Sequence, residues 1–327
     1  MKYFGMTSLF LILSGLIAGC TNNGGVTYSG NAPGWYESSY TGPFNNIITY
    51  GSYVIAAGNQ GIFRSTNSGI SWMPPDSTLP ATNFSLAMEG NTFIAAGNGP
   101  YGAYISTDSG ATWTKDDSGL TANGSGRYAP IISIAGYGPD IFAGVQGSGV
   151  YRATDPATIW TPANGGMRNA SVFSFTFVGT RIFAGTGQGI YISSDNGRNW
   201  APSGNGLTAN NYNPGSIPPI VALTASRTEI YAGSQYGDVF VSKDYGNSWT
   251  DISSGLPNVK GGRVSLAVRD SCLVAGDSLG VYVTTNDGGS WKNITDNISN
   301  PGISSVVMTG EFLYVSSSDS TVWRRPL

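Results

Sequence analysis

The side chains that could do chemistry in this sequence are a few arginines and carboxylates, because histidine is absent from all 327 residues. Without histidine, imidazole metal sites and the Ser-His-Asp and Cys-His nucleophile systems are excluded, as is the most common general base. Asp and Glu number 19 and Lys and Arg 16, which gives a net charge of -3. Because the chain has no excess of basic residues, we predict that it does not bind nucleic acid. We also predict that it binds neither a metal nor a cofactor.

Three arginines could act together. Arg127, Arg168 and Arg263 each lie just before a short apolar run that begins a sequence repeat. If these runs line the centre of a ring, the three guanidinium groups converge and could bind carboxylates, phosphates or an acidic protein segment. The alternative is that they are independent surface residues. Tyrosines that could add aromatic contact area near them are Tyr101, Tyr128, Tyr137, Tyr151 and Tyr236.

Carboxylates provide a second possible chemistry. A pair of carboxylates ~5 to 9 Å apart hydrolyses glycosidic bonds. Asp238, Asp277 and Asp319 lie in short loops that we expect on the same face as the arginines, so such a pair is possible there. Of the four glutamates, Glu89, Glu229 and Glu311 are expected on the opposite face. Glu37 is expected in a strand at the start of the ring.

The elements that must position these residues are repeats. Five octapeptides end in tryptophan: STNSGISW (65–72), STDSGATW (106–113), SSDNGRNW (193–200), SKDYGNSW (242–249) and TTNDGGSW (284–291). A sixth, ATDPATIW (153–160), is degenerate. Successive tryptophans are 41, 47, 40, 49 and 42 residues apart, a spacing typical of four-stranded propeller blades.

Strand patterns around the octapeptides give the number of blades. An alternating hairpin pattern, such as 182–193 or 230–242, precedes each octapeptide, and another short strand precedes each hairpin. Seven such first strands occur, so we predict an all-β, seven-bladed β-propeller. The last repeat, 311–327, ends without a fourth strand, whereas Trp35-Tyr36-Glu37-Ser38 precedes the first repeat and has no hairpin. We therefore predict that both chain ends share the last blade, which removes two open sheet edges.

The octapeptides themselves are predicted to be structural. An Asp side chain accepts backbone N–H bonds across the turn, Gly supplies a positive φ, and Trp packs between blades. Asn67 and Asn286 replace the Asp, and Ala157 replaces the Gly of the degenerate copy. The alternative role is ligand or calcium binding. The residues assigned to the structural role are Ser65, Asn67, Gly69, Trp72, Ser106, Asp108, Gly110, Trp113, Asp155, Trp160, Ser193, Asp195, Gly197, Trp200, Ser242, Asp244, Gly246, Trp249, Thr284, Asn286, Gly288 and Trp291.

The first residues are typical of an export signal. Lys2 supplies a positive charge, residues 4–17 are largely apolar, and Ile17-Ala18-Gly19-Cys20 follows. The run is too short to span a bilayer. We predict a signal peptide at 1–19, a modified cysteine and flexible tether at 20–34, and a propeller at 35–327. Cys272 is then expected to be a lone thiol and a buried strand residue.

These motifs resemble known families. The octapeptides resemble the Asp-box (BNR) repeat, Ser-x-Asp-x-Gly-x-Thr/Ser-Trp, of sialidase-like propellers, and residues 35–327 resemble photosystem II stability/assembly factors. The second resemblance implies an assembly role with membrane-protein clients. Ile17 to Cys20 resembles the bacterial lipobox, which implies that Cys20 carries lipid. A sialidase also has a Phe/Tyr-Arg-Ile-Pro motif, for which this chain offers only Phe63-Arg64-Ser65-Thr66.

The sequence thus predicts a non-catalytic, monomeric lipoprotein of the bacterial envelope. Its partners would be envelope proteins or glycans, bound on the propeller face opposite the Asp boxes. The alternative function is a sialidase-like or other glycoside hydrolase, or a carbohydrate-binding propeller. Thr21 follows Cys20 without the Asp that signals inner-membrane retention, which favours the outer membrane. A secreted or periplasmic location is the alternative.

Overall fold

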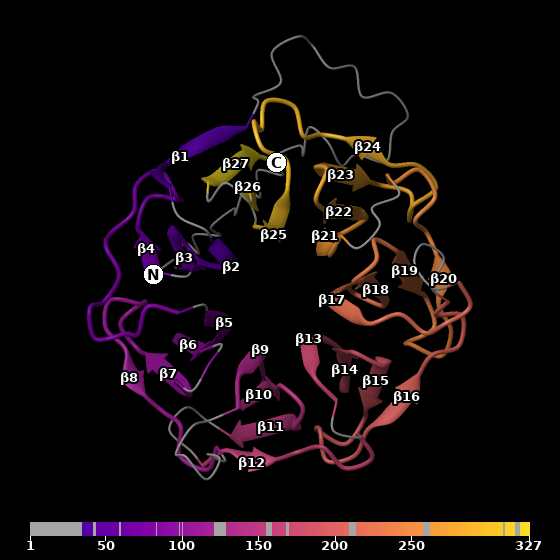
Figure 1. Ribbon diagram of the computed structural model, residues 1–327, viewed down its shortest axis with the longest axis horizontal. Coiled ribbons are helices and arrows are strands. Elements are labelled where there is room, and N and C mark those ends of the chain that lie inside the picture. Colours follow the sequence, from indigo (N-terminus) through magenta and orange to yellow (C-terminus); the bar gives the residue numbers. More distant parts are fainter. Residues whose placement is uncertain are drawn as a thin grey trace, which may run out of the picture.

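The computed structural model describes residues 35–41, 44–58, 60–82, 84–97, 99, 101–120, 129–154, 159–167, 170–208, 214–257, 262–309, 311–317 and 321–327. In these ranges the chain forms 27 strands and no helix, and the strands make seven sheets around a central axis (Figure 1). The predicted all-β, seven-bladed propeller is therefore confirmed. Within the same ranges, no helix is long and apolar enough to cross a membrane.

Each blade is numbered here by its order along the chain, and its first strand lines the central channel (Figure 1). The seven inner strands are β2 (Phe44–Tyr50), β5 (Phe84–Glu89), β9 (Ile131–Tyr137), β13 (Val172–Val178), β17 (Ile220–Ser226), β21 (Ser265–Arg269) and β25 (Ile303–Met308). The second strands are β3 (Tyr53–Gly58), β6 (Thr92–Gly97), β10 (Asp140–Val145), β14 (Arg181–Thr186), β18 (Glu229–Ser234), β22 (Cys272–Gly276) and β26 (Phe312–Ser317).

The outer half of each blade is less regular. Third strands are β4 (Gly61–Ser65), β7 (Ala103–Ser106), β11 (Gly149–Thr154), β15 (Gly189–Ser193), β19 (Val239–Ser242), β23 (Val281–Thr284) and β27 (Thr321–Pro326). Fourth strands are short, except the one supplied by the N-terminal segment: β8 (Thr114–Lys115), β12 (Thr161–Pro162), β16 (Ala201–Ser203), β20 (Thr250–Asp251), β24 (Lys292–Asn293) and β1 (Tyr36–Thr41).

Blade 1 departs from the four-stranded pattern. Its sheet contains only β2, β3 and β4, and a single bridge joins Arg64 to Met73 where a fourth strand would run. In blade 6 the third residue after the box tryptophan, Ile294, donates its N–H to the third strand, at Val281. The equivalent residue in blade 1 is Pro75, which has no N–H to donate, so the ladder stops after one pair.

Both chain ends share blade 7, as predicted. The order of its sheet is β1-β27-β26-β25, and Glu37 pairs with Trp323 in the antiparallel β1–β27 ladder. Trp35 precedes this strand as a box tryptophan precedes the fourth strand of other blades. Its indole N–H donates to the Ile294 carbonyl of blade 6 at 2.7 Å, so the N-terminal segment binds both its own blade and the neighbouring one.

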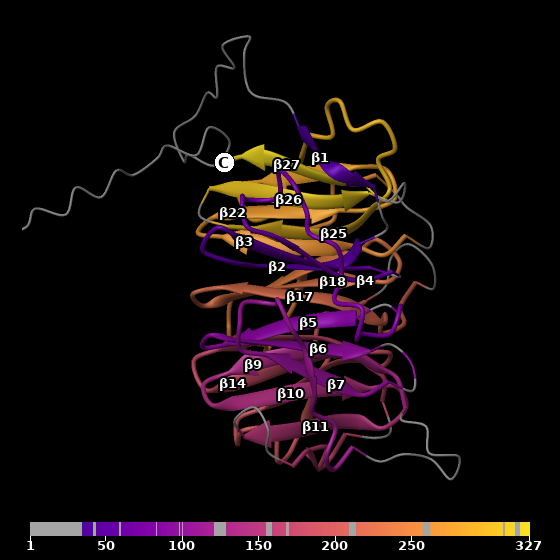
Figure 2. The ribbon, with the colours of Figure 1, turned by 90° about the vertical axis from the view of Figure 1, so that its left-hand side faces the viewer.

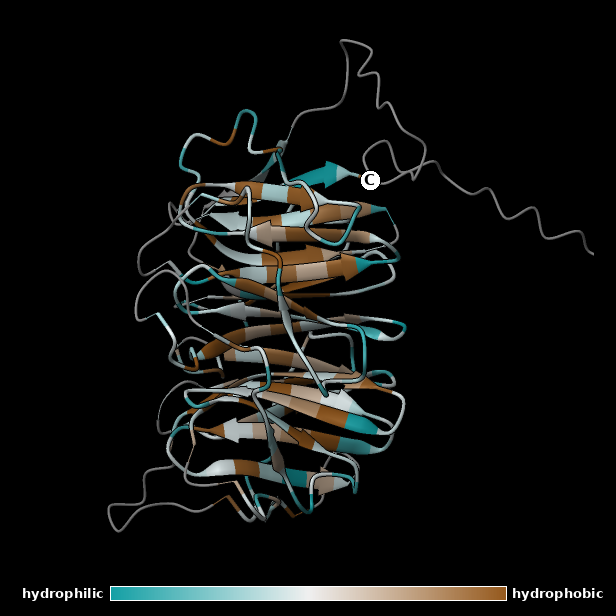
Figure 3. Ribbon diagram, turned by 90° about the vertical axis from the view of Figure 1, so that its right-hand side faces the viewer, coloured by the Kyte–Doolittle hydropathy of each residue, from teal (hydrophilic) through white to brown (hydrophobic). Residues whose placement is uncertain are grey.

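Apolar side chains fill the spaces between successive sheets. Seen from the side, the sheets stand face to face around the ring, and hydrophobic residues concentrate on the strands (Figures 2 and 3). The cluster between blades 7 and 1, for example, joins Phe44, Val54 and Phe63 to Tyr314 and Val322. Burial of these faces drives the assembly of each blade on its neighbour, since a sheet with two apolar faces cannot stand alone in water.

Tryptophan indoles link the blades at their outer edges. In six blades the indole N–H donates to the third residue after the tryptophan of the preceding blade. Trp200 donates to the Ala163 carbonyl at 2.8 Å, for instance, and Trp249 donates to Ser203 Oγ at 3.0 Å. The remaining four pairs are Trp35 with Ile294, Trp72 with Ser38, Trp160 with Asp116 and Trp291 with Ile252. These six bonds therefore link neighbouring blades around most of the outer edge of the ring.

The octapeptide turns are closed by their own side chains. In blade 4, Asp195 Oδ1 accepts bonds from Ser193 Oγ and from the Asn199 N–H, both at 2.9 Å, and the Gly197 N–H donates to Ser193 Oγ. Residues Asn196 and Gly197 both have positive φ, of 61° and 78°. A Cβ on Gly197 would lie 2.7 Å from Phe142 of blade 3, so the glycine also permits close packing between blades.

In two of the octapeptides an asparagine accepts the turn hydrogen bond that Asp195 accepts in blade 4. Asn67 Oδ1 accepts the Ser71 N–H at 2.9 Å, and Asn286 Oδ1 accepts the Ser290 N–H at 3.0 Å. Both amide groups then donate to the serine hydroxyl of the same turn. In the degenerate copy, Asp155 lies outside the described residues, and Trp160 is 1% exposed.

Cys272 is a buried residue of β22, as expected. The described residues contain no free cysteine, however, and Cys272 is disulfide-bonded. The expectation of a lone thiol at this position is therefore wrong, because its sulfur already forms a covalent bond. Cys20, the other cysteine of the sequence, lies outside the described residues.

We predict that Trp200→Ala lowers the free energy of unfolding by ~3 to 5 kcal/mol, because it leaves a cavity between blades 3 and 4. Chemical denaturation monitored by circular dichroism measures the change. The neighbouring Arg198→Ala variant is the control, since Arg198 is exposed, and should stay within ~0.5 kcal/mol of the parent chain. Equal stability of the two variants would refute the packing role of Trp200.

The box carboxylates predict an acid-sensitive component of stability. Bonds from Asn199 lower the pKa of Asp195 from 3.8 to about 2, and bonds from Ser248 lower that of Asp244 to about 2. For Asp108, desolvation opposes the shift, but the bonds from Thr112, Ser106 and Ala111 prevail and lower its pKa to about 2. A pKa below the unfolded value favours the folded chain above pH ~4, and this contribution is lost as pH falls toward about 2.

Urea midpoints measured between pH 4 and pH 2 test this expectation. The triple variant Asp108→Asn, Asp195→Asn, Asp244→Asn should lose less stability over this interval than the parent chain, because an amide keeps the turn bonds without titrating. Parallel declines in the two proteins would show that these carboxylates do not cause the acid sensitivity.

Candidate functional site

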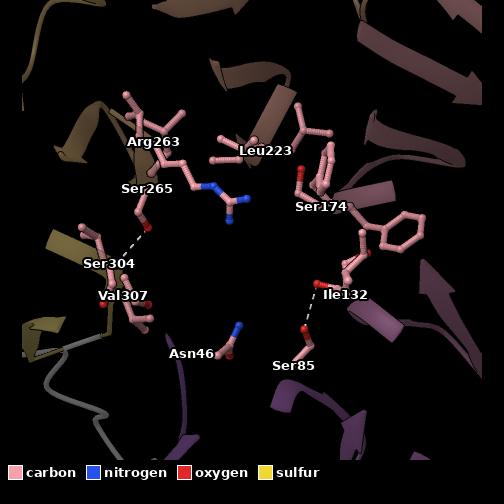
Figure 4. Close-up of a pocket in the computed structure, with 18 of the residues that line it drawn as sticks. Asn46, Ser85, Ile132, Ser174, Leu223, Arg263, Ser265, Ser304 and Val307 are labelled. Atoms are coloured by element: carbon pink, nitrogen blue, oxygen red, sulfur yellow. Dashed lines mark hydrogen bonds between the residues drawn. The ribbon is translucent and has the colours of Figure 1, made fainter. Parts of the chain in front are cut away.

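A cavity of about 700 Å³ occupies one end of the central channel. All seven inner strands contribute to it through residues between their starts and their middles, such as Ser85 of β5, Ser174 of β13 and Leu223 of β17 (Figure 4). Inner strands begin where the joining loops from the previous blade arrive. The cavity therefore lies at the joining-loop end of the channel.

The Asp boxes lie at the opposite end. Strands within a blade are antiparallel, so the box turn after the third strand shares its end with the turn between the first two strands. Asp195 and Gly197, for example, lie at the end where β13 meets β14. The sequence-based division into an Asp-box face and a joining-loop face matches this arrangement of strands.

Serine side chains of the inner strands form hydrogen bonds from one blade to the next around part of the cavity wall. We call this set of serine positions the girdle. Ser133 Oγ of β9 donates to the Val172 carbonyl of the next blade at 2.7 Å, and Ser85 Oγ donates to the Ile132 carbonyl at 3.0 Å (Figure 4). Ser304 Oγ donates to the Phe44 carbonyl at 2.9 Å, which links blades 7 and 1. These hydroxyls join adjacent inner strands that share no sheet hydrogen bonds.

The girdle weakens around blade 5. Ser174 of blade 4 occupies the girdle position, but its buried hydroxyl has no hydrogen-bond partner in the part of the chain that the structure describes. The equivalent residue of blade 5 is Ala222, which pairs with Gly233 as Ser133 pairs with Gly144 and so has no hydroxyl to donate. These positions were not predicted from the sequence, although a serine recurs near the start of most first strands.

Arg263 is the single charged residue among those that line the cavity. It lies just before β21, is exposed, and points its guanidinium group into the open space (Figure 4). No ion pair joins it to any residue that the structure describes. None of the lining residues, all of which are described, is Asp or Glu. The cavity is therefore electropositive and suited to an anionic group.

The other two arginines of the predicted cluster, Arg127 and Arg168, lie outside the described residues. Their convergence with Arg263 therefore stays a prediction. Tyr101 and Tyr236 lie in second-to-third strand turns at the joining-loop end, but neither lines the cavity.

The other three tyrosines predicted near the arginines lie away from the cavity or are not among the described residues. Tyr128 is not among the described residues, and Tyr151 is 6% exposed in the core between blades. Tyr137 ends β9 at the Asp-box end and stacks on Phe177, with ring centroids 4.6 Å apart. The expectation that it lies near the arginines is wrong, because β9 carries it along the full length of the channel.

The candidate acids at the joining-loop end are engaged in their own turns. Asp277 is 3% exposed, and its Oδ1 accepts the Leu279 N–H at 2.7 Å and the Gly280 N–H at 3.0 Å. Burial raises the pKa of Asp277 despite these bonds. Asp238 is fully buried, and its Oδ2 accepts a bond from Ser234 Oγ at 3.0 Å. Asp319 lies outside the described residues.

A tyrosine and glutamate pair occurs at the other end of the propeller. Tyr231 donates its hydroxyl to Glu229 Oε2 at 2.8 Å and also contacts Asp287 Oδ1 of blade 6 at 3.1 Å. Burial, followed by the two carboxylates, strongly raises the pKa of Tyr231, which is 1% exposed. Lys243 joins both carboxylates. The Tyr231 side chain is closed to solvent, and the network joins blades 5 and 6.

A metal site is absent from the described residues, in which no group of three or more acidic or cysteine side chains could hold an ion. Oxygen atoms of Asp195 and Asp244 already accept bonds within their own turns.

Comparisons with known proteins identify the fold and no family. No protein-family model matches the sequence, and no curated protein matches it. Among solved structures, YCF48 bound to D1 peptide has a TM-score of 0.67 and 13% identity over 90% of this chain and 96% of that chain. YCF48 from Cyanidioschyzon merolae has a TM-score of 0.65 and 14% identity, covering 90% and 99% of the two chains.

A glycoside hydrolase is also similar in structure. The GH74 xyloglucanase from Xanthomonas campestris has a TM-score of 0.67 and 16% identity over 90% of this chain, but the match covers 53% of the enzyme. Identities this low show a shared propeller. The resemblance to assembly-factor and hydrolase propellers is therefore confirmed for the fold.

We predict opposite effects of two substitutions in the girdle. Ser133→Ala removes the donor to the buried Val172 carbonyl and should lower the free energy of unfolding by ~1 to 3 kcal/mol. Ala222→Ser supplies a hydroxyl beside the Val264 carbonyl and should raise it by ~0.5 to 1.5 kcal/mol. Urea unfolding of both variants measures the effects. A stabilising Ser133→Ala substitution would contradict the girdle.

Proposed function

We propose that this chain is a non-catalytic binding or assembly scaffold that captures its partner at the joining-loop end of the channel. The observation that carries the proposal is the cavity around Arg263, which holds a guanidinium group without an acidic partner on the described wall. A free cation beside apolar surface favours a partner with an exposed carboxylate and apolar side chains.

A polypeptide is the partner that we favour. The structure of YCF48 with a D1 peptide is an instance of a similar propeller bound to a polypeptide segment. The resemblance to photosystem II assembly factors supports an assembly role in the same way, with membrane proteins or other envelope components as clients. Glycans of the envelope are the second class of partner.

Hydrolysis of glycans is the competing function. The similarity to a GH74 xyloglucanase supports it at the level of the fold. Against it, the cavity wall carries no carboxylate, and Asp238 and Asp277 are buried within their turns. A two-carboxylate mechanism needs both groups exposed to substrate, so we favour binding without catalysis.

We place the mature protein in the bacterial envelope, attached by lipid on Cys20 and facing its clients from the outer membrane. The lipobox-like segment Ile17-Ala18-Gly19-Cys20 supports this proposal. A cysteine sulfur forms either a lipid thioether or a disulfide, so an experiment has to separate these two states. Secretion without an anchor is the alternative.

Cross-linked capture from native envelope tests the binding proposal. We expect Arg263→Glu to lose specific partners, because it reverses the charge at the channel mouth. Arg198→Glu is the matched control: it makes the same charge change on an exposed residue of the Asp-box face and should keep them. Partners retained by both variants would refute the Arg263 site.

A parallel assay separates binding from catalysis. Purified protein is incubated with xyloglucan and with sialylated oligosaccharides, and released sugars are measured. We expect no release above that of a denatured sample. Turnover that Arg263→Glu abolishes would replace the scaffold proposal by the hydrolase.

The lipid anchor predicts a change of fractionation. Full-length precursor expressed in a Gram-negative host should sediment with membranes, whereas Cys20→Ser should be released into the soluble fraction. Mass spectrometry of the mature N-terminal peptide checks for the acyl groups. An unlipidated Cys20 that is alkylated only after reduction would contradict the anchor.

A further inference from the structure

The cavity also has the properties of a small-molecule site. Its volume of about 700 Å³ lies within the range of pockets that enclose small ligands, about 300 to 1,000 Å³. Apolar side chains such as Phe173, Phe175 and Leu223 share the wall with polar groups, which supply the larger part of its exposed surface. Such pockets fix an apolar ligand by a small number of directed hydrogen bonds.

Several hydroxyls of the wall are already used, whereas two side-chain amides and one guanidinium group keep unused N–H donors. The hydroxyls of Ser85, Ser133 and Ser304 donate to carbonyls of neighbouring strands. The side chains of Asn46 and Gln146 make no hydrogen bond to a described residue, and Arg263 has no ion pair with one. Asn46 and Arg263 reach into the cavity from different walls (Figure 4).

These unused groups define the charge of a fitting ligand. Arg263 supplies one positive charge, and the lining residues supply no negative one. A monoanion balances this charge, whereas a dianion would bring a second negative charge for which the lining residues supply no second cation. A carboxylate also matches the two-pronged geometry of a guanidinium group, with amide donors available for its second oxygen.

We propose that the channel binds a small monocarboxylic acid with an apolar body, whose carboxylate pairs with Arg263 and receives a further hydrogen bond from Asn46. This site goes beyond the scaffold function. The two share Arg263, but a small acid needs no polypeptide partner and fills the interior of the cavity.

Calorimetric titration of the purified propeller with 3-phenylpropionate tests the site, with 3-phenylpropionamide as a neutral probe and phenyl phosphate as a dianionic one. We expect 3-phenylpropionate to bind more tightly than either. Arg263→Gln should weaken it at least about tenfold, or ~1.4 kcal/mol, and Arg198→Gln should leave it unchanged. Equal binding of acid and amide, or equal binding by the two variants, overturns the proposal.

A second pair of variants tests the cavity itself. Asn46→Asp places a negative charge on the wall without changing side-chain shape, so it should weaken 3-phenylpropionate binding about tenfold. Asn67→Asp makes the same change in the box of blade 1 and should have no effect. No detectable binding of the acid to the parent protein overturns the small-molecule site. Loss of captured envelope partners by Arg263→Glu would still support the scaffold, so the two failures are distinguishable.

Discussion

The close contact between one blade and the next is the constraint on which the rest of this structure depends. A box glycine must lie against the preceding blade, as Gly197 lies against Phe142, and a tryptophan must reach that blade's outer strand, as Trp200 reaches Ala163. Asp195 holds the intervening turn closed. The repeat therefore encodes contacts between blades as much as the blades themselves, and the indole bonds of six tryptophans recur around the ring.

Ring closure determines what the channel can offer a partner. The inner strands are held together by serine hydroxyls and by outer contacts, since no sheet hydrogen bonds join β9 to β13. Their N-terminal halves surround a space into which, among the described residues that line it, Arg263 brings the guanidinium group. The described acids nearest this end, Asp238 and Asp277, accept hydrogen bonds within their own turns. The function that we propose follows from this separation of roles.

The sequence was sufficient for the fold because its repeats are periodic and their turns are chemically specific. Trp323 at a third-strand position and Trp35 without a hairpin predicted the shared last blade. The missing strand of blade 1 was also encoded, in Pro74 and Pro75, but no pattern of apolar residues signals it. The site was harder to predict, because Asn46, Gln146 and the serines acquire a common role only when seven separate strands meet. The position of Tyr137 at the far end shows the same limit.

Hydrogen–deuterium exchange of the intact protein, with and without a captured envelope partner, tests the central claim most directly. Our account predicts that the partner protects backbone amides at the starts of the inner strands, around Ser174, Leu223 and Ser265, and leaves the Asp-box turns unchanged. Protection confined to the box turns, with the channel mouth unaffected, would contradict it.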